Sequence, residues 1–284
     1  MRIFKRKLYD KLLDWKNNRG GKTAVMIEGA RRVGKSTLAK QFAKKEYESY
    51  VLIDFSIASK EIMELFDYIS DLEYFFMQLQ FRLGVSLIER KSLVIFDEVQ
   101  KCPKARQAIK HLVADGRYDY IETGSLISIH KNVKDIVIPS EEEKMTLNPM
   151  DYEEFKWAQD DTVSYPQLKM LFDKKIAIGD AVARKLMRDF RIYMVVGGMP
   201  QAVSEYLDSH NLQEVDRVKR GIIQLYEDDF YKIDPSGRIS SLFDAIPAQL
   251  NSNASRYQIT ATIGNNADSE KVLQLISELR ESRT

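Results

Sequence analysis

The sequence is poor in the side chains that build disulfide frameworks and protein-bound metal centres. It has one cysteine, Cys102, and three histidines, His111, His130 and His210. A single cysteine excludes an intramolecular disulfide and a cysteine-based zinc site, and such scarcity is typical of a reducing cytoplasm. The histidines match no metal-ligand spacing. We therefore expect a cytoplasmic protein without a structural metal site.

The sequence also lacks long apolar runs and an excess of charge of either sign. No run approaches the about 20 residues that a transmembrane helix needs, and no apolar stretch follows the basic N-terminus as it would in a signal peptide. With 43 basic and 42 acidic residues, the formal net charge is +1. No overall positive field therefore favours nucleic acid or an anionic membrane. These absences predict a soluble globular protein with no membrane partner.

The most regular feature of the sequence is an alternation of short apolar runs with helical patterns. Apolar runs occupy 23–28, 50–55, 92–98 and 118–123, and a fifth strand candidate lies within 135–147. Such alternation is typical of a parallel sheet covered by helices on both faces. The sequence thus predicts an α/β fold with a three-layer parallel sheet, followed from about residue 148 by helical patterns alone.

The most specific motif is GARRVGKS, which fits G-x-x-x-x-G-K-[ST] and lies between an apolar run and a helical pattern. Its backbone N–H groups and the following helix N-terminus attract an anion. Lys35 is placed to reach the β- and γ-phosphates of a nucleoside triphosphate, and the Ser36 hydroxyl to ligate Mg²⁺. We assign nucleotide binding to Gly29, Ala30, Arg31, Arg32, Val33, Gly34, Lys35, Ser36 and Thr37.

Two carboxylates end the apolar run at 92–98. The carboxyl ends of strands carry the ligand sites of open α/β sheets, so Asp97 and Glu98 are expected beside the phosphate loop. Asp97 is a candidate Mg²⁺ ligand, and Glu98 a candidate catalytic base for the attacking water. The alternative is a strand end made soluble by two acids.

The nucleotide is expected to be ATP. A guanine site needs an Asn-Lys-x-Asp element, and in Asn132-Val133-Lys134-Asp135 the lysine stands one position late. An Asp followed directly by Glu also favours hydrolysis over small-molecule kinase chemistry.

A polar strand end follows at Thr123-Gly124-Ser125. A hydroxyl here is placed to contact the γ-phosphate or the attacking water, and we take Ser125 as the catalytic candidate. The alternative is a plain turn, for which Thr-Gly-Ser is a common sequence.

These segments resemble the AAA-type ATPases of bacteria and archaea in the STAND-related branch. The resemblance covers about residues 20–250 and rests on GARRVGKS, LVIFDEVQKCP, ETGS, MTLNPMDYEEF and YMVVGGMPQAV. It implies an additional-strand sheet, in which the strand ending at Ser125 inserts between those carrying Lys35 and Asp97. It also implies a helical lid from about Asn148-Pro149, and self-association.

Composition, helical patterns and the resemblance together predict a division of the chain, and the chain departs from the family in its length and in one motif. The expected parts are a basic N-terminal helix (1–22), a P-loop ATPase core (23–147), a helical lid (148–235) and the start of a winged-helix-like domain (236–284), whose continuation is absent. The family commonly has a Gly-Arg pair where this chain reads IVIPSEEEKMTL. Arg31, Arg32 and Arg117 are the remaining candidates for an arginine finger.

Two functions remain open from the sequence. The leading one is an ATPase whose Mg²⁺-dependent hydrolysis drives a conformational or assembly switch, with homo-oligomers or a protein effector as partners. The other is a DNA-binding module that uses ATP as a regulatory ligand, favoured by the net charge of +6 in residues 1–22. A terminal apolar stripe, Val272, Leu275, Ile276 and Leu279, either packs back on the chain or forms an interface.

Overall fold

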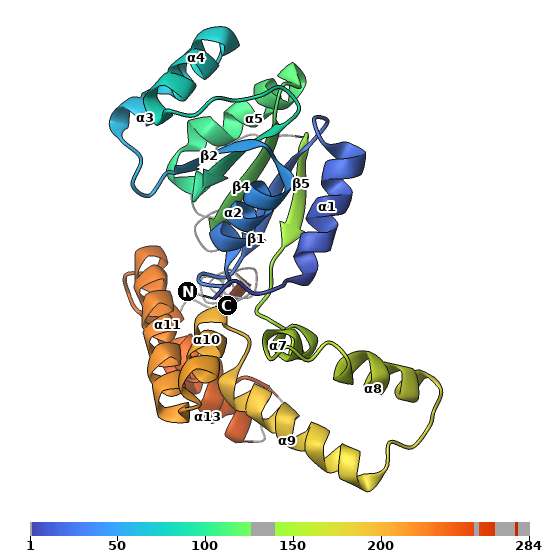
Figure 1. Ribbon diagram of the computed structural model, residues 1–284. Helices are drawn as coiled ribbons and strands as arrows, with labels where there is room; N and C mark the ends of the chain where they lie inside the picture. The colour runs from blue at the N-terminus through green and yellow to red at the C-terminus, as the bar shows by residue number, and fades with distance from the viewer. Residues whose placement is uncertain (1, 126–139, 253–255, 265–275, 278–284) are drawn as a thin grey trace.

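A five-stranded parallel sheet forms the centre of the α/β part of the molecule (Figure 1). The computed structural model describes residues 2–125, 140–252, 256–264 and 276–277. The strands are β1 (Ala24–Gly29), β2 (Ser49–Asp54), β3 (Ser92–Asp97), β4 (Asp119–Ser125) and β5 (Glu142–Thr146). All four neighbouring pairs are parallel. The predicted α/β fold and the fifth strand are confirmed.

The strand order, β2-β3-β4-β1-β5, places β4 between β1 and β3. Ile121 of β4 is in register with Val25 on one side and with Ile95 on the other. This is the additional-strand arrangement expected from the resemblance. Because the strands are parallel, the carboxyl ends of β1, β4 and β3 meet at one edge of the sheet, where Gly29, Thr123 and Asp97 lie.

Helices cover both faces of this sheet, which explains why its strands are continuous apolar runs. Alternate residues of β1 point to opposite layers: Val25 and Ile27 pack in one cluster, Ala24 and Met26 in the other. The first cluster is covered by α1 (Lys7–Arg19) and α2 (Lys35–Glu46). The second is covered by α3 (Lys60–Glu64), α4 (Leu72–Leu83) and α5 (Pro103–Asp115).

From residue 152 onward every described element is a helix, as the sequence predicts. These helices are α7 (Tyr152–Ala158), α8 (Ser164–Asp173), α9 (Asp180–Val196), α10 (Pro200–Ser209), α11 (Leu212–Ile233), α12 (Arg238–Asp244), α13 (Ile246–Asn251) and α14 (Ile259–Ile263). A small core around Phe155, Val196 and Val203 joins α7, α9 and α10. Residues 197–199 separate α9 from α10, which begins at Pro200.

Helix α11 belongs to both parts of the molecule. Its Val215 packs in the helical core, whereas Ile222, Tyr226 and Phe230 pack in the layer that covers the sheet. The helical region is therefore held against the α/β core along α11. The proposed domain boundaries remain predictions.

The basic N-terminal stretch is more firmly packed than a solvated helix. Leu8, Leu12 and Trp15 of α1 are buried, and the Trp15 indole N–H donates to Thr23 Oγ1 at 3.0 Å. The Asn132–Asp135 element and the terminal stripe, apart from Ile276, lie outside the described residues. No helix in the described part combines the length and apolar content of a membrane span.

Candidate nucleotide site

The phosphate loop connects β1 to α2 and depends on two glycines. A Cβ at Gly29 would stand 2.3 Å from the carbonyl oxygen of Leu147, so only glycine lets the chain after β5 approach this closely. Gly34 has φ 99°, in the left-handed region that favours glycine. No side chain caps α2 at Gly34, which leaves the first amide groups of this 12-residue helix available to an anion.

The Lys35 ammonium lies inside the loop. Its Nζ donates to the carbonyl oxygens of Gly29 and Ala30, each at 2.9 Å, and its side chain is buried. Burial lowers the pKa of Lys35 to about 8, although the negative charges of Glu98 and Asp97 oppose the shift. A desolvated ammonium bound to two neutral carbonyls favours binding of an anion.

Two hydroxyl groups converge on the Asp97 carboxylate. Ser36 Oγ donates to Asp97 Oδ1 at 2.7 Å, and Thr123 Oγ1 donates to the same oxygen. Asp97 and Thr123 are both buried. The structure therefore brings the predicted ligands Ser36 and Asp97 together and adds Thr123.

This donor set fits Mg²⁺, which prefers oxygen ligands and keeps several for phosphates and water. A cluster of three or more acidic, histidine or cysteine side chains, which would indicate an all-protein metal cage, does not occur among the described residues. One carboxylate and one hydroxyl are the ligands that the protein is expected to supply to Mg²⁺ at a nucleotide site.

Glu98 directly follows β3 and has a left-handed backbone, with φ 56°. A non-glycine residue in this conformation costs on the order of 1–3 kcal/mol. Its carboxylate oxygen Oε2 accepts a hydrogen bond from Gln100 Nε2 at 2.5 Å, and its backbone N–H donates to Thr123 Oγ1 at 3.4 Å. Glu98 is thus held just beyond the strand end that carries Asp97, with its carboxylate bound by Gln100.

The predicted catalytic hydroxyl, Ser125, lies at the last position of β4, in register with Gly29. Its Oγ is buried and has no hydrogen-bond partner within the described ranges. Of the two hydroxyls in Thr123-Gly124-Ser125, it is that of Thr123 that contacts Asp97, although the sequence alone assigns Thr123 no role separate from Ser125. The catalytic role of Ser125 remains a prediction.

The three arginine candidates have different surroundings. Arg31 donates to both carboxylate oxygens of Asp229 in α11, at 3.1 and 3.0 Å. Arg32 is exposed. Arg117 precedes β4, at the end of the sheet opposite the loop, and pairs with Asp115 and Glu73.

Arg6 is a functional candidate that the sequence analysis missed. It is 5% exposed, and its guanidinium donates to the carbonyl oxygen of Val33 at 2.8 Å, to that of Asn148 at 2.5 Å and to Glu154 Oε1 at 3.2 Å. One side chain thus joins the phosphate loop, the start of the helical region and α7. Nothing in the sequence distinguishes it from the other basic residues of 1–22.

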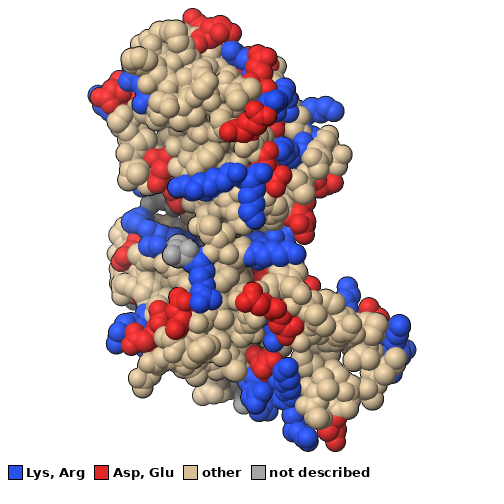
Figure 2. All heavy atoms as spheres, in the orientation of Figure 1, with Lys and Arg blue, Asp and Glu red and all other residues tan. Residues whose placement is uncertain are grey.

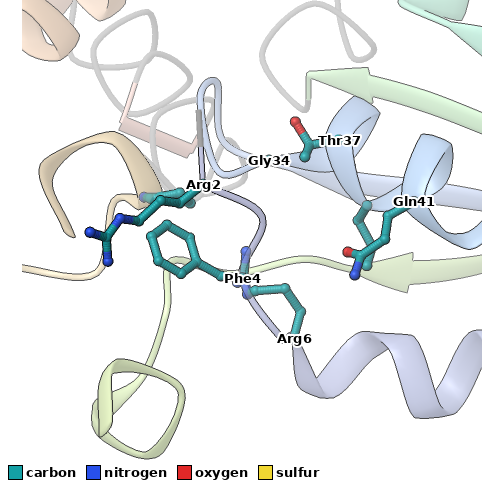
Figure 3. A pocket seen from close by; sticks show the side chains of 8 residues that line it. Arg2, Phe4, Arg6, Gly34, Thr37 and Gln41 are labelled. Carbon is teal, nitrogen blue, oxygen red and sulfur yellow. The ribbon is translucent and has the colours of Figure 1, made fainter. Parts of the chain in front are cut away.

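A pocket opens beside the loop, at the start of α2 (Figure 3). Arg2, Phe4 and Arg6 contribute from the N-terminal segment and Pro200 from α10. The α2 side supplies Gly34, Thr37, Leu38 and Gln41. The cavity volume of ≈ 20 Å³ holds about one water molecule, which is far less than a purine needs.

The fold and the phosphate loop are those of a P-loop NTPase with an additional-strand sheet. Residues 21–156 match the family described as AAA domain, and residues 187–283 match a domain of unknown function. No curated protein matches the chain. The predicted division at residue 236 falls inside the second matched segment.

One solved structure supports this fold, and a second is more distantly similar. The Walker-type ATPase PABY2304 of Pyrococcus abyssi is 16% identical, with a TM-score of 0.60 over 99% of this chain and 90% of that one. AMPPCP-bound DnaA from Aquifex aeolicus is 11% identical, with a TM-score of 0.41 over 100% of this chain and 90% of that chain. At 16% identity, the likeness to PABY2304 shows a shared fold and nothing about function.

Proposed function

We propose that the protein binds ATP with Mg²⁺ and hydrolyses it, and that hydrolysis changes the contact between the α/β core and the helical region. The observation that carries this proposal is the meeting of Lys35, Ser36 and Asp97 at one edge of the sheet, with Glu98 directly beyond. We also propose that the protein belongs to the STAND-related branch of AAA-type ATPases.

Each side chain has a separate role in this proposal. Lys35 leaves its two carbonyl partners for the β- and γ-phosphate oxygens, and Ser36 and Asp97 hold Mg²⁺ directly or through water. When bound, Mg²⁺ stabilises negative charge on the phosphate oxygens. Glu98, positioned by Gln100, accepts a proton from the attacking water. Ser125 donates its hydroxyl to the γ-phosphate or to that water.

The small pocket beside the loop suits the adenine ring, because apolar side chains of Phe4, Leu38 and Pro200 line it and Gln41 supplies amide groups. A purine requires this pocket to widen, so the N-terminal segment has to move on binding. Arg6 ties that segment to Glu154 of α7. Occupation of the site is therefore coupled to the helical region through Arg6.

A second coupling runs through the loop itself. Arg31 pairs with Asp229, and the Tyr226 hydroxyl donates to the carbonyl oxygen of Arg31 at 2.8 Å. Both partners lie on α11, which packs in both cores. A γ-phosphate near Arg31 competes with Asp229 for its guanidinium, so nucleotide binding and hydrolysis change how α11 is held.

The alternative, a DNA-binding module with ATP as a ligand, has weaker support. Several basic residues of the N-terminal stretch are already paired: Arg2 with Asp208, Arg6 with Glu154, Lys7 with Asp151 and Glu153, and Arg19 with Glu143. Cations that neutralise carboxylates of their own chain contribute little to phosphate binding.

Two carboxylate variants test the ATPase proposal. Glu98→Gln removes the base and keeps the metal ligand, so Mg·ATP binding should persist while turnover falls by at least ~100-fold. Asp97→Ala should instead weaken the Mg²⁺-dependent part of ATP affinity. Calorimetry and phosphate release measure the two effects. Wild-type turnover by Glu98→Gln would refute its catalytic role.

A further inference from the structure

The helical hairpin α8–α9, residues 164–196 and here called the arm, projects away from the rest of the molecule (Figure 1). No residue of α8 is buried, and Val196 is the only buried residue of α9. Large apolar side chains are exposed along its whole length: Met170, Phe172, Ile176, Val182, Met187, Phe190 and Met194. A monomer gains nothing from exposing so much apolar surface on one hairpin, so the arm has the properties of a docking element.

The arm is also strongly basic. It contains seven Lys or Arg and three Asp, a net charge of +4. All seven basic side chains are exposed, and none forms an ion pair with a carboxylate in the described ranges. The arm therefore favours an acidic partner that also offers apolar surface.

The opposite end of the molecule offers such a surface. Residues 54–83, here called the α3–α4 face, contain six acidic and two basic residues, a net charge of −4. A groove of ≈ 550 Å³ lies between the end of edge strand β2 and helices α3 and α4. Ile57 is 82% exposed at this groove, and Phe81 on α4 is 85% exposed.

Some of the acidic charge on this face is already neutralised. Lys104 pairs with Asp67, Arg117 with Glu73 and Lys60 with Glu64. Asp54 and Glu61 line the groove together with one basic residue, Arg82, and neither carboxylate forms an ion pair in the part of the chain that the structure describes. The groove thus keeps two unpaired carboxylates against one guanidinium, a net negative charge for a basic partner.

We propose that the arm of one copy docks on the α3–α4 face of a second copy. The two surfaces match in both respects, apolar side chains and opposite charge. In Figure 2, blue side chains lie along the arm, and red ones are prominent at the end that carries α3 and α4. Because the two surfaces lie at opposite ends of the molecule, one chain cannot satisfy both by itself (Figure 1).

This contact is head to tail and joins different surfaces, so it builds rings or open chains of copies instead of a two-fold dimer. A nucleic acid would also suit the basic side chains of the arm. It would leave Phe172, Met187 and Met194 without an apolar partner, and for this reason the second copy is the better occupant.

The test uses sedimentation velocity from 1 to 100 μM, without nucleotide and with Mg·ATP. The arm variant carries Phe172→Asp and Met187→Asp; the face variant carries Ile57→Asp and Phe81→Asp. Wild type should show a sedimentation coefficient that rises with concentration, and each variant alone should stay monomeric. An equimolar mixture of the two variants should stop at a dimer, because only one intact arm and one intact face remain.

Two controls distinguish loss of this specific contact from a general effect of removing exposed apolar side chains. Leu250→Asp replaces a residue of α13 that is 76% exposed and should assemble like wild type. Arg188→Glu should weaken assembly, and Glu61→Lys on the partner copy should restore part of it. All substituted side chains are exposed, so circular dichroism should show a folded chain in each case.

Monomeric wild type at every concentration would overturn the proposal, as would assembly of either variant alone. Loss of duplex DNA binding in the arm variant, with a monomeric wild type, would assign the arm to nucleic acid instead. The proposal goes beyond ATP hydrolysis: Lys35→Ala should still associate without nucleotide, so failure of the proposed function leaves this result unchanged.

Discussion

Arg6 offers a measurable test of how the N-terminal segment, the phosphate loop and the helical region are joined. Arg6→Ala removes a buried cation from the Glu154 carboxylate and leaves the Val33 and Asn148 carbonyl oxygens without a donor. Breaking a buried ion pair from one side costs about 3–5 kcal/mol. Glu154 keeps backbone donors from Lys7 and Asp151, at 2.7 and 3.3 Å, so the lower end of that range applies.

Arg2→Ala is the matched control. Arg2 pairs with Asp208, but their side chains are 48% and 55% exposed, and such a pair contributes about 0–1 kcal/mol. Urea unfolding followed by tryptophan fluorescence measures both, because Trp15 is buried between α1 and the sheet. We expect a loss of about 3 kcal/mol for Arg6→Ala, which at an m-value of about 3 kcal/mol/M shifts the midpoint by about 1 M.

The double variant Arg6→Ala with Glu154→Gln completes the cycle. Removing the charge of Glu154 should recover part of the loss, since an unpaired buried carboxylate is then no longer present. A loss below about 1 kcal/mol for Arg6→Ala, equal to that of Arg2→Ala, would refute the role of Arg6 as the link between the three elements.

The remaining predictions concern the nucleotide. The pKa of Lys35 is lowered to about 8 in the free protein, and a bound phosphate raises it, so ATP binding at pH 8.5 should be accompanied by proton uptake. Calorimetry in buffers of different ionisation enthalpy measures this uptake. Binding without proton uptake would contradict the burial of this lysine. Affinity for ATP should fall as the pH rises through 8 and beyond. GTP should have no advantage over ATP in competition binding, and a clear GTP preference would exclude the adenine assignment. Thr123→Val should weaken Mg²⁺-dependent binding more than Ser125→Ala, since Thr123 and not Ser125 contacts Asp97; equal effects would remove that distinction.

The α/β core could be predicted from the sequence because its signals are local. Strands buried on both faces are continuous apolar runs, and the phosphate loop combines a fixed glycine spacing with a lysine and a hydroxyl. The meeting of Ser36 with Asp97 follows from the parallel topology once these elements are recognised, but the strand order does not. The strand that inserts between β1 and β3 was expected only from the family resemblance.

Long-range contacts of charged residues could not be predicted in this way. Arg6 and Glu154 are 148 positions apart, and the sequence around each of them predicts an exposed charged side chain. The acidic stretch 141–143 also suggests a solvated segment, yet the side chain of Glu142 is fully buried and pairs with Arg106 at 3.0 Å. The periodicity of a sequence predicts which face of a helix or strand is apolar. It does not predict ion pairs between charged residues that are distant in the sequence.

Calorimetric titration of Mg·ATP into the wild type and into Lys35→Ala tests the central claim most directly. The ammonium of Lys35 lies in the loop between β1 and α2, and its removal leaves the sheet and its covering layers in place. We predict saturable binding by the wild type and at least ~100-fold weaker binding by Lys35→Ala, with unchanged circular dichroism. Equal affinities, or no binding by a folded wild type, would contradict the assignment of this loop as a nucleotide site.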